Sequence, residues 1–451
     1  MADFLATAPI LLVFAWIALR RIRQFDAAER PLLWLAFLMH QLAGFVNIGV
    51  TKLYYGYGDM LSYYRFGLVA SDRLHSDFWG LTPGLLGLIF RQPDPVAIPV
   101  DTLSPMSSTG SMQGLASFMT YFLFDSLYAI CAVIAGLSFL SKVALYVVAR
   151  EELPEIPPRS LLMTCLLLPS ALFWSCSLLK EPIAMIGLLV AIHSWHSVAK
   201  RRNIVRSAIL GILGSTVIIL FKGYIFPALG LAIGAWYLIK NVRNKRGDIA
   251  LTLGHAAIAA GAAIGIIAIT GLLLPRFSAD ALSDQLADIQ NVGARVNGRA
   301  NYSLGEKAGI ANSQVALAPL GLFTALFRPT LLEATTPLVL IGALEMTAFL
   351  IATLVVPFRR GIPAALSELL KKPFLGFCAM FVLIFGTCVG LATTNLGTLS
   401  RYRMPLTPFF ATILVALLTR RRVSTAFRAS GAPGPSPTPL GTASQLPARS
   451  T

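Results

Sequence analysis

The fold class follows from the stretch LLLPSALFWSCSLLKEPIAMIGLLVAI, residues Leu166–Ile192, which is apolar almost throughout. A helix of about 20 apolar residues crosses the hydrocarbon core of a bilayer, and this run is long enough to begin two such helices. Lys180, Glu181 and Pro182 lie near its centre and divide it. Because proline is tolerated in the first turn of a helix, we predict a hairpin between two spans in which Pro182 begins the second.

The rest of the chain shares this apolar character. Of its 451 residues, 56% are hydrophobic and only 13% are charged, and a soluble domain of this composition could not cover its surface with polar groups. Helices are expected because a bilayer leaves backbone polar groups no partner except one another. We therefore predict an all-α polytopic membrane protein. The eleven expected spans are residues 4–19, 31–51, 117–140, 160–179, 182–199, 205–221, 224–240, 249–274, 335–357, 373–394 and 404–419.

The basic residues indicate an orientation in the membrane. The formal net charge of +16 comes from short clusters between apolar runs, a pattern that favours topology signals over nucleic-acid binding. With eleven spans, the main clusters all fall on one side, which the positive-inside rule makes cytoplasmic. The sequence thus predicts a bacterial inner-membrane protein with its N-terminus outside and its C-terminus in the cytoplasm. The clusters lie within residues 20–23, 200–202, 240–246, 359–372 and 420–422.

The domain organisation is simple. We expect one membrane domain with two long outer loops, followed by a cytoplasmic tail that is disordered because it is rich in Pro, Ser, Gly and Ala. Apolar stretches at Leu81–Phe90 and Val315–Phe327 predict short re-entrant or interfacial helices within the loops. The expected bounds are 1–428 for the membrane domain, about 52–116 and 275–334 for the loops, and 429–451 for the tail.

The cysteines give no sign of a cofactor. All five fall inside apolar segments without the spacing of metal ligands, which favours small apolar core residues over disulfides or a zinc site. No metal-binding residue is predicted; a divalent metal is compatible with the predicted chemistry, although the sequence offers no ligand set that requires one. The five are Cys131, Cys165, Cys176, Cys378 and Cys388.

Charged residues also gather at the predicted outer ends of the spans, where the positive-inside rule disfavours arginine. One example is YYGYGDMLSYYRFG, in which Asp59 and Tyr63 would share a face of a helix. Two interpretations are open: a salt-bridge network that joins the helices, or a site for an anionic ligand. The charged residues concerned are Asp59, Arg65, Lys180, Glu181, Lys222, Arg328, Glu333, Arg401 and Arg403.

Such a face suits glycosyl transfer from a sugar carried on a polyprenyl phosphate or diphosphate. Arginine forks match phosphate oxygens and could stabilise the leaving phosphate. A carboxylate at the same level could remove a proton from the acceptor hydroxyl, with Asp59 the first choice as catalytic base and Glu181 the second. The predicted substrate-binding residues are Tyr63, Tyr64, Arg65, Lys180, Lys222, Arg328, Arg401 and Arg403.

Three short pieces resemble enzymes of envelope polysaccharide assembly. GDMLSYY, with Asp59, is similar to the acidic first outer loop of GT-C membrane glycosyltransferases and to an Asp–Tyr feature of capsule and exopolysaccharide polymerases. PSALFWSCSLLKEPIAM and RYRMPLTPFF resemble elements of other members of such operons. The resemblance implies a membrane glycosyltransferase or repeat-unit polymerase of polysaccharide biosynthesis. Its partners would be a polyprenyl-linked saccharide, an acceptor glycan, the bilayer and other members of an assembly complex.

The sequence departs from the GT-C pattern in two ways. The first outer loop has no DxD or ExD pair, and no large soluble C-terminal domain follows the last span. Two long outer loops that carry arginines are more similar to an O-antigen-type polymerase. The choice between a single-sugar transferase and a polymerase therefore stays open.

A secondary transporter or lipid flippase is the main alternative, and a non-catalytic scaffold of an export complex is the third. The transporter is favoured by Glu345, near the middle of the ninth predicted span, and by Asp125, in the outer part of the third. Carboxylates inside a membrane often line proton or substrate paths. A structural role for Glu345, hydrogen-bonded to a neighbouring helix, is an equally open interpretation.

Overall fold

A computed structural model describes residues 2–93, 103–244, 311–393 and 395–419. The secondary-structure elements of these residues are all helical, and several are long and apolar enough to cross a membrane. The prediction of an all-α polytopic membrane protein is thereby confirmed. The seven span-length stretches are Leu5–Ile22 in α1 (Ala2–Ile22), Arg30–Tyr55 in α2 (Arg30–Gly49) with the π-helix η1 (Val50–Tyr55), α6 (Leu127–Glu152), α9 (Lys180–Ala199), α10 (Ile204–Lys222), α15 (Pro337–Arg360) and α17 (Pro373–Ala392).

Two further predicted spans coincide with shorter apolar stretches. Ile225–Asn241 belongs to α11 (Ile225–Asn244), and α19 covers Thr407–Leu418. They match the predictions at 224–240 and 404–419 in position. The predicted span at 249–274 and the predicted tail at 429–451 lie outside the described residues.

The third predicted span, 117–140, is wrong in its bounds. Helix α5 (Ser108–Phe122) ends at a break where Phe124 and Asp125 adopt positive φ angles of 55° and 56°. α6 then begins at Leu127, capped by the Ser126 hydroxyl, which accepts a hydrogen bond from the backbone of Ala129. Asp125 is therefore an exposed residue between two helices, and its predicted place inside a span is also wrong.

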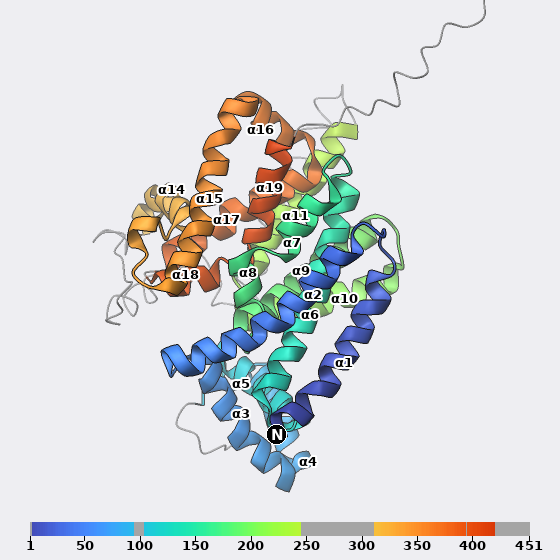
Figure 1. Ribbon diagram of the computed structural model, residues 1–451, viewed down its shortest axis with the longest axis vertical. Coiled ribbons are helices and arrows are strands. Elements are labelled where there is room, and N and C mark those ends of the chain that lie inside the picture. The colour runs from blue at the N-terminus through green and yellow to red at the C-terminus, as the bar shows by residue number, and fades with distance from the viewer. Residues whose placement is uncertain (1, 94–102, 245–310, 394, 420–451) are drawn as a thin grey trace, which may run out of the picture. The chain divides into compact units, whose positions relative to one another are not determined.

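The predicted span at 160–179 consists instead of two short helices, α7 (Pro158–Leu166) and α8 (Pro169–Trp174), drawn as separate ribbons in Figure 1. Pro169 is responsible, because proline has no N–H to donate and disfavours the helical conformation of the residue before it. The following five residues form turns, and α9 starts at Lys180. Pro182 lies in its first turn, as predicted.

The short apolar helices predicted in the two loops are confirmed by α4 (Phe78–Ile89) and α14 (Ala311–Phe327). α4 packs with α5 and α3 (Asp59–Ser76) around a small core that includes Phe66, Leu74 and Leu85. These three helices lie together near the N-terminus of α1 in Figure 1. The remaining short elements are η4 (Leu331–Glu333), α16 (Ile362–Lys371) and α18 (Leu396–Tyr402).

The spans differ in how much of their surface faces other helices. In the 18-residue apolar window of α6, 72% of the residues are buried, against 22% in the corresponding windows of α15 and α10. α6 is thus the central helix of the described part, whereas α10 and α15 leave most of their surface for lipid.

Glycines bring α9 and α10 close together. A Cβ atom on Gly187 would lie 2.8 Å from the carbonyl oxygen of Gly214, and one on Gly214 would lie 2.6 Å from that of Gly187. Only residues without a side chain allow this approach. The contact aligns the start of α9 with the end of α10, and so brings Glu181 near Lys222.

Ion pairs mark the end of the bundle where α6 finishes. Arg150 pairs with Asp26 at 2.5 Å and with Glu29 at 3.0 Å. His196 lies 3.0 Å from Glu152. We call this the Arg150 end and the opposite one, where α3 and α9 begin, the Asp59 end. Because α6 has 26 residues, the two ends are roughly 40 Å apart along it.

Candidate functional site

Four charged side chains from four helices meet at the Asp59 end. Arg401 donates to Asp59 across 2.7 Å, and its Nε lies 3.4 Å from Oε1 of Glu181. The same Glu181 oxygen lies 2.9 Å from the ammonium group of Lys222. We call these four residues the Arg401 cluster. It unites four of the sequence-predicted site residues, which come from α3, α9, α10 and α18.

Each member of the cluster has the charge that its helix end favours. Asp59 and Glu181 lie in the first turns of α3 and α9, whereas Lys222 and Arg401 lie in the last turns of α10 and α18. Carboxylates are stabilised at helix N-termini and cations at C-termini, because the aligned peptide dipoles leave partial charges there. The helix ends and the ion pairs therefore favour the same arrangement.

The cluster is graded in exposure. The side chain of Glu181 is 3% exposed, that of Lys222 8%, that of Arg401 16% and that of Asp59 47%. Burial lowers the pKa of the Arg401 guanidinium, but the Glu181 and Asp59 carboxylates raise it more strongly, so that its pKa lies above the usual range. Asp59 is thus the member of the cluster that a water-borne or headgroup-level ligand can reach.

Tyrosine side chains adjoin the cluster, among them Tyr402 and Tyr63. The Lys222 ammonium lies 3.9 Å from the ring centroid of Tyr402, a cation–π distance. Tyr63 lies one turn after Asp59 in α3 and is buried, which confirms that the two share a helix face. Burial, and then the Asp59 and Glu181 carboxylates, raise the pKa of Tyr63 well above its ordinary value. It therefore remains a neutral phenol.

Lys180 points away from its neighbour Glu181. Its ammonium donates to the hydroxyls of Ser108 at 3.3 Å and Thr109 at 3.2 Å. Lys180 thus ties the start of α9 to the start of α5.

Arg328, Glu333 and Arg403 form a separate group beside the cluster. Arg403 is 1% exposed and donates to the carbonyl of Arg328 and, at 3.3 Å, to the hydroxyl of Ser400. Arg328 donates from Nε to Glu333 across 2.7 Å. This geometry makes Arg403 an internal brace of the loop before α15, whereas the sequence predicted a ligand contact. The phosphate role of Arg328 and Arg403 stays a prediction.

Glu333 also closes the turn that carries η4. One of its oxygens accepts from the backbone N–H of Thr330 at 2.8 Å and from the hydroxyl of Thr330 at 3.0 Å. Partial burial raises the pKa of Glu333. The hydrogen bonds from Arg328 and Thr330 lower the pKa by more than burial raises it, so that the pKa lies below its usual value.

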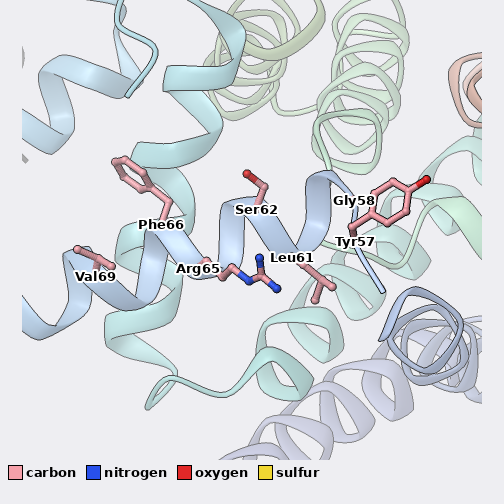
Figure 2. Close-up of a pocket in the computed structure, with 7 residues that line it drawn as sticks. All are labelled: Tyr57, Gly58, Leu61, Ser62, Arg65, Phe66 and Val69. Carbon is pink, nitrogen blue, oxygen red and sulfur yellow. The ribbon is translucent and has the colours of Figure 1, made fainter. Parts of the chain in front are cut away.

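The other face of α3 borders a hollow of about 430 Å³. Arg65 lies in it, exposed and close to Leu61 and Ser62, as Figure 2 shows. Tyr64, also a predicted ligand contact, donates its hydroxyl to the carbonyl of Asp125 across 2.6 Å. The residues that line the hollow are Tyr57, Gly58, Leu61, Ser62, Arg65, Phe66 and Val69.

Lys142 is a buried charged residue that the sequence analysis does not identify. Lys142, in the middle of α6, is fully buried and donates to the Ala171 carbonyl at 3.1 Å and to the Ser175 hydroxyl at 2.7 Å. The apolar pattern places it just after the predicted span 117–140, where a lysine is unremarkable. The break at residues 123–126 shifts the helix and carries Lys142 into the interior. The helix-capping serine at that break was the available signal.

Glu345 contacts the broken segment between α7 and α9. Its Oε2 accepts from the backbone N–H of Ser170 across 2.7 Å, which matches the structural interpretation given above. Its other oxygen is buried and has no hydrogen-bond partner among the described residues.

Within the described ranges, no three His, Cys, Asp or Glu side chains come together as a metal site would require. Four of the cysteines are buried and Cys388 is partly buried, all as free thiols. In comparisons with protein-family models, curated proteins and solved structures, no match to this chain was found.

Proposed function

We propose that this membrane protein is a glycosyltransferase or repeat-unit polymerase that uses polyprenyl-phosphate- or diphosphate-linked sugars in polysaccharide biosynthesis. The proposal rests on the contact between Asp59 and Arg401, which are 342 positions apart in the chain. This contact holds a half-exposed carboxylate at a helix N-terminus beside a hollow. A carboxylate so placed can accept a proton from an acceptor hydroxyl.

In the proposed reaction, Asp59 removes the proton of the acceptor hydroxyl. The oxygen then forms a bond to the anomeric carbon of the donor sugar, and the bond from that carbon to the phosphate oxygen breaks. The phosphate leaves with the electron pair, and arginine side chains at the Asp59 end stabilise its charge. Glu181 is nearly inaccessible and is held by Lys222 and Arg401, so we assign it a positioning role and keep Asp59 as the base.

In this proposal the Asp59 end faces the outside of the inner membrane. Lipid-linked sugars are then met at the outer headgroup level, and the basic clusters lie in the cytoplasm, as the positive-inside rule requires. Reporter fusions after Asp77 and after Lys200 test this orientation. A signal after Asp77 from a reporter that works only in the cytoplasm would contradict this orientation.

The test of the reaction is mass spectrometry of the lipids from cells that lack the protein or carry a variant. Asp59→Asn should reduce transfer roughly 100-fold or more, as expected for loss of a general base. Both the deletion and Asp59→Asn should accumulate polyprenyl-linked saccharide. Asp72→Asn, the same change at an exposed position of the same helix, serves as the matched control. Normal polymer and lipid in Asp59→Asn cells, at equal protein abundance, would refute the proposal.

Glu345 supports a second candidate, a transporter or flippase. A carboxylate with an unpaired buried oxygen beside an interrupted helix is typical of transporter sites, where broken helices expose backbone groups. Loss of function in Glu345→Gln, with Asp59→Asn behaving as wild type, would favour this candidate over glycosyl transfer.

A further inference from the structure

Helix α3 presents two functional faces. Asp59 and Tyr63, four residues apart, face the Arg401 cluster. Leu61, Ser62 and Arg65 follow one another at helical spacing on a different face and line the hollow (Figure 2). The two faces meet at the N-terminus of α3, where Gly58 lines the hollow and the next residue, Asp59, belongs to the Arg401 cluster.

Arg65 differs in its lack of an acceptor from the cations of the Arg401 cluster and from Lys180 and Arg403 next to it. Arg401 and Lys222 are paired with carboxylates, Lys180 with two hydroxyls, and Arg403 with a carbonyl oxygen. No hydrogen bond or ion pair joins Arg65 to another residue that the structure describes. Its planar fork is therefore available for an anion, and it fits phosphate oxygens in a two-point contact.

The hollow is amphipathic. Leu61, Phe66 and Val69 give it an apolar side, while Ser62 and Arg65 contribute a hydroxyl and a guanidinium to its lining. Tyr57 is 77% exposed at the same rim. An exposed tyrosine ring is a common surface for a sugar face or for the membrane interface. A ligand that fits all of these features carries a phosphate, an apolar chain and a sugar.

The hollow has the surroundings expected at the level of lipid headgroups. The hollow starts directly after η1, which forms the end of the second span. In η1, the side chain of Leu53 is 90% exposed and that of Tyr54 is 54% exposed. Apolar and aromatic side chains with this exposure at the end of a span are stable where headgroups and acyl chains meet.

We infer that the hollow along α3 binds the phosphate headgroup of a lipid-linked saccharide, with Arg65 on the phosphate and Leu61, Phe66 and Val69 against the first part of the chain. This inference rests on the proposed function for the saccharide and extends it by naming the donor-binding site. The donor would then lie on one face of α3 and Asp59 on the next, both in the part of the helix between Asp59 and Val69.

The test is a binding titration of the purified full chain, in which native mass spectrometry measures the bound lipid. The probes are a polyprenyl monophosphate and, separately, dioleoyl phosphatidylglycerol. Arg65→Gln should weaken binding of the polyprenyl monophosphate about tenfold or more, because a charge-assisted contact is lost. Arg65→Lys should recover part of the affinity, since lysine keeps the charge and not the fork. Ser62→Trp, at an exposed position, should block the hollow with all charges kept.

Arg206→Gln is the matched control. Arg206 is also exposed and borders a hollow of about 640 Å³ with Ile204, Val205 and Ile209. It lies in the first turn of α10, at the opposite end of this helix from Lys222. Unchanged binding in this variant, with the loss in Arg65→Gln, supports the inference.

Equal affinity of wild type, Arg65→Gln and Ser62→Trp would overturn it. So would phosphatidylglycerol binding as tightly as the polyprenyl monophosphate with the same dependence on Arg65, since the hollow would then hold bulk lipid only. The two proposals fail separately. If Asp59→Asn cells make normal polymer while lipid binding depends on Arg65, the proposed reaction is refuted and the binding site is kept. If Asp59→Asn cells stop making polymer while lipid binding does not depend on Arg65, only the binding site is refuted.

Discussion

The Arg401 cluster and Lys142 are two ways of holding cations away from water. In the cluster, Lys222 and Arg401 share the carboxylate of Glu181, and Arg401 also contacts Asp59. Lys142 has a carbonyl and a hydroxyl as partners, both neutral. The cluster lies at helix ends, whereas Lys142 lies in the middle of the most enclosed span.

The difference shows what each region loses when one residue changes. Removing one member of a buried ion pair leaves an uncompensated charge in a low-dielectric environment, which costs more than the pair contributed. Removing Lys142 leaves only neutral acceptors without a donor. The cluster should therefore be more sensitive to substitution than the surroundings of Lys142.

The largest effect is expected for Glu181→Gln. The change leaves Lys222 buried and without its carboxylate, and it should lower the free energy of unfolding by about 3–5 kcal/mol. Unfolding in mixed micelles measures the loss. Adding Lys222→Met should recover a substantial part of it, because the unpaired charge is removed as well. A double variant less stable than Glu181→Gln alone would contradict the assignment.

Lys142→Met should cost less, about 1–3 kcal/mol, since the Ser175 hydroxyl and the Ala171 carbonyl lose a donor and no ion pair is broken. The same unfolding assay applies. A loss as large as that of Glu181→Gln would erase the distinction and would require a carboxylate partner for Lys142.

Arg401→Lys should change stability by only about 1 kcal/mol, because the positive charge stays and one partner, Asp59, is half-exposed. Transfer activity should fall at least about tenfold, since lysine cannot contact Asp59 and Glu181 at once with a planar fork. Separate measurements of stability and of accumulated lipid-linked saccharide distinguish the two effects. Wild-type transfer activity in this variant would show that the reaction does not need the planar guanidinium group of Arg401.

The smallest effect concerns pH and Glu333. Its pKa is lowered in the folded protein from the usual 4.5, so the carboxylate contributes stability above about pH 4.5 and loses this contribution as the pH falls through the folded pKa. For a partly exposed pair the contribution is less than about 1 kcal/mol. The stability difference between wild type and Glu333→Gln should therefore shrink below pH 4.5. A difference independent of pH would contradict this account.

Much of the architecture can be read from the sequence, and the failures are local. Apolar length predicts the span-length helices of the described part, all except α6, and the short helices α4 and α14. The pattern fails at residues 123–126 and at Pro169, because hydropathy averages over residues and does not register a serine cap or a left-handed turn. The misplacement of Asp125 and the oversight of Lys142 both follow from the first of these breaks.

The candidate site divides in the same manner. The residue types at the span ends identify a wider set of charged residues that includes Asp59, Glu181, Lys222 and Arg401, because charges are rare in this chain and arginine is disfavoured at those positions. Their pairing could not be predicted, nor could the separation of Arg403 and Arg328 from Arg65. Those distinctions depend on which side of each helix faces a neighbour.

The sequence by itself thus determines the membrane class, the helical spans and the charged character of the Asp59 end, because apolar length and net charge are properties of the chain. Tertiary structure alone decides that Asp59 meets Arg401 across 342 positions, that Lys142 is buried, and that Arg65 faces a hollow. The physical reason is that ion pairing and burial depend on distances between helices, and helix packing through close contacts such as Gly187 with Gly214 sets these distances.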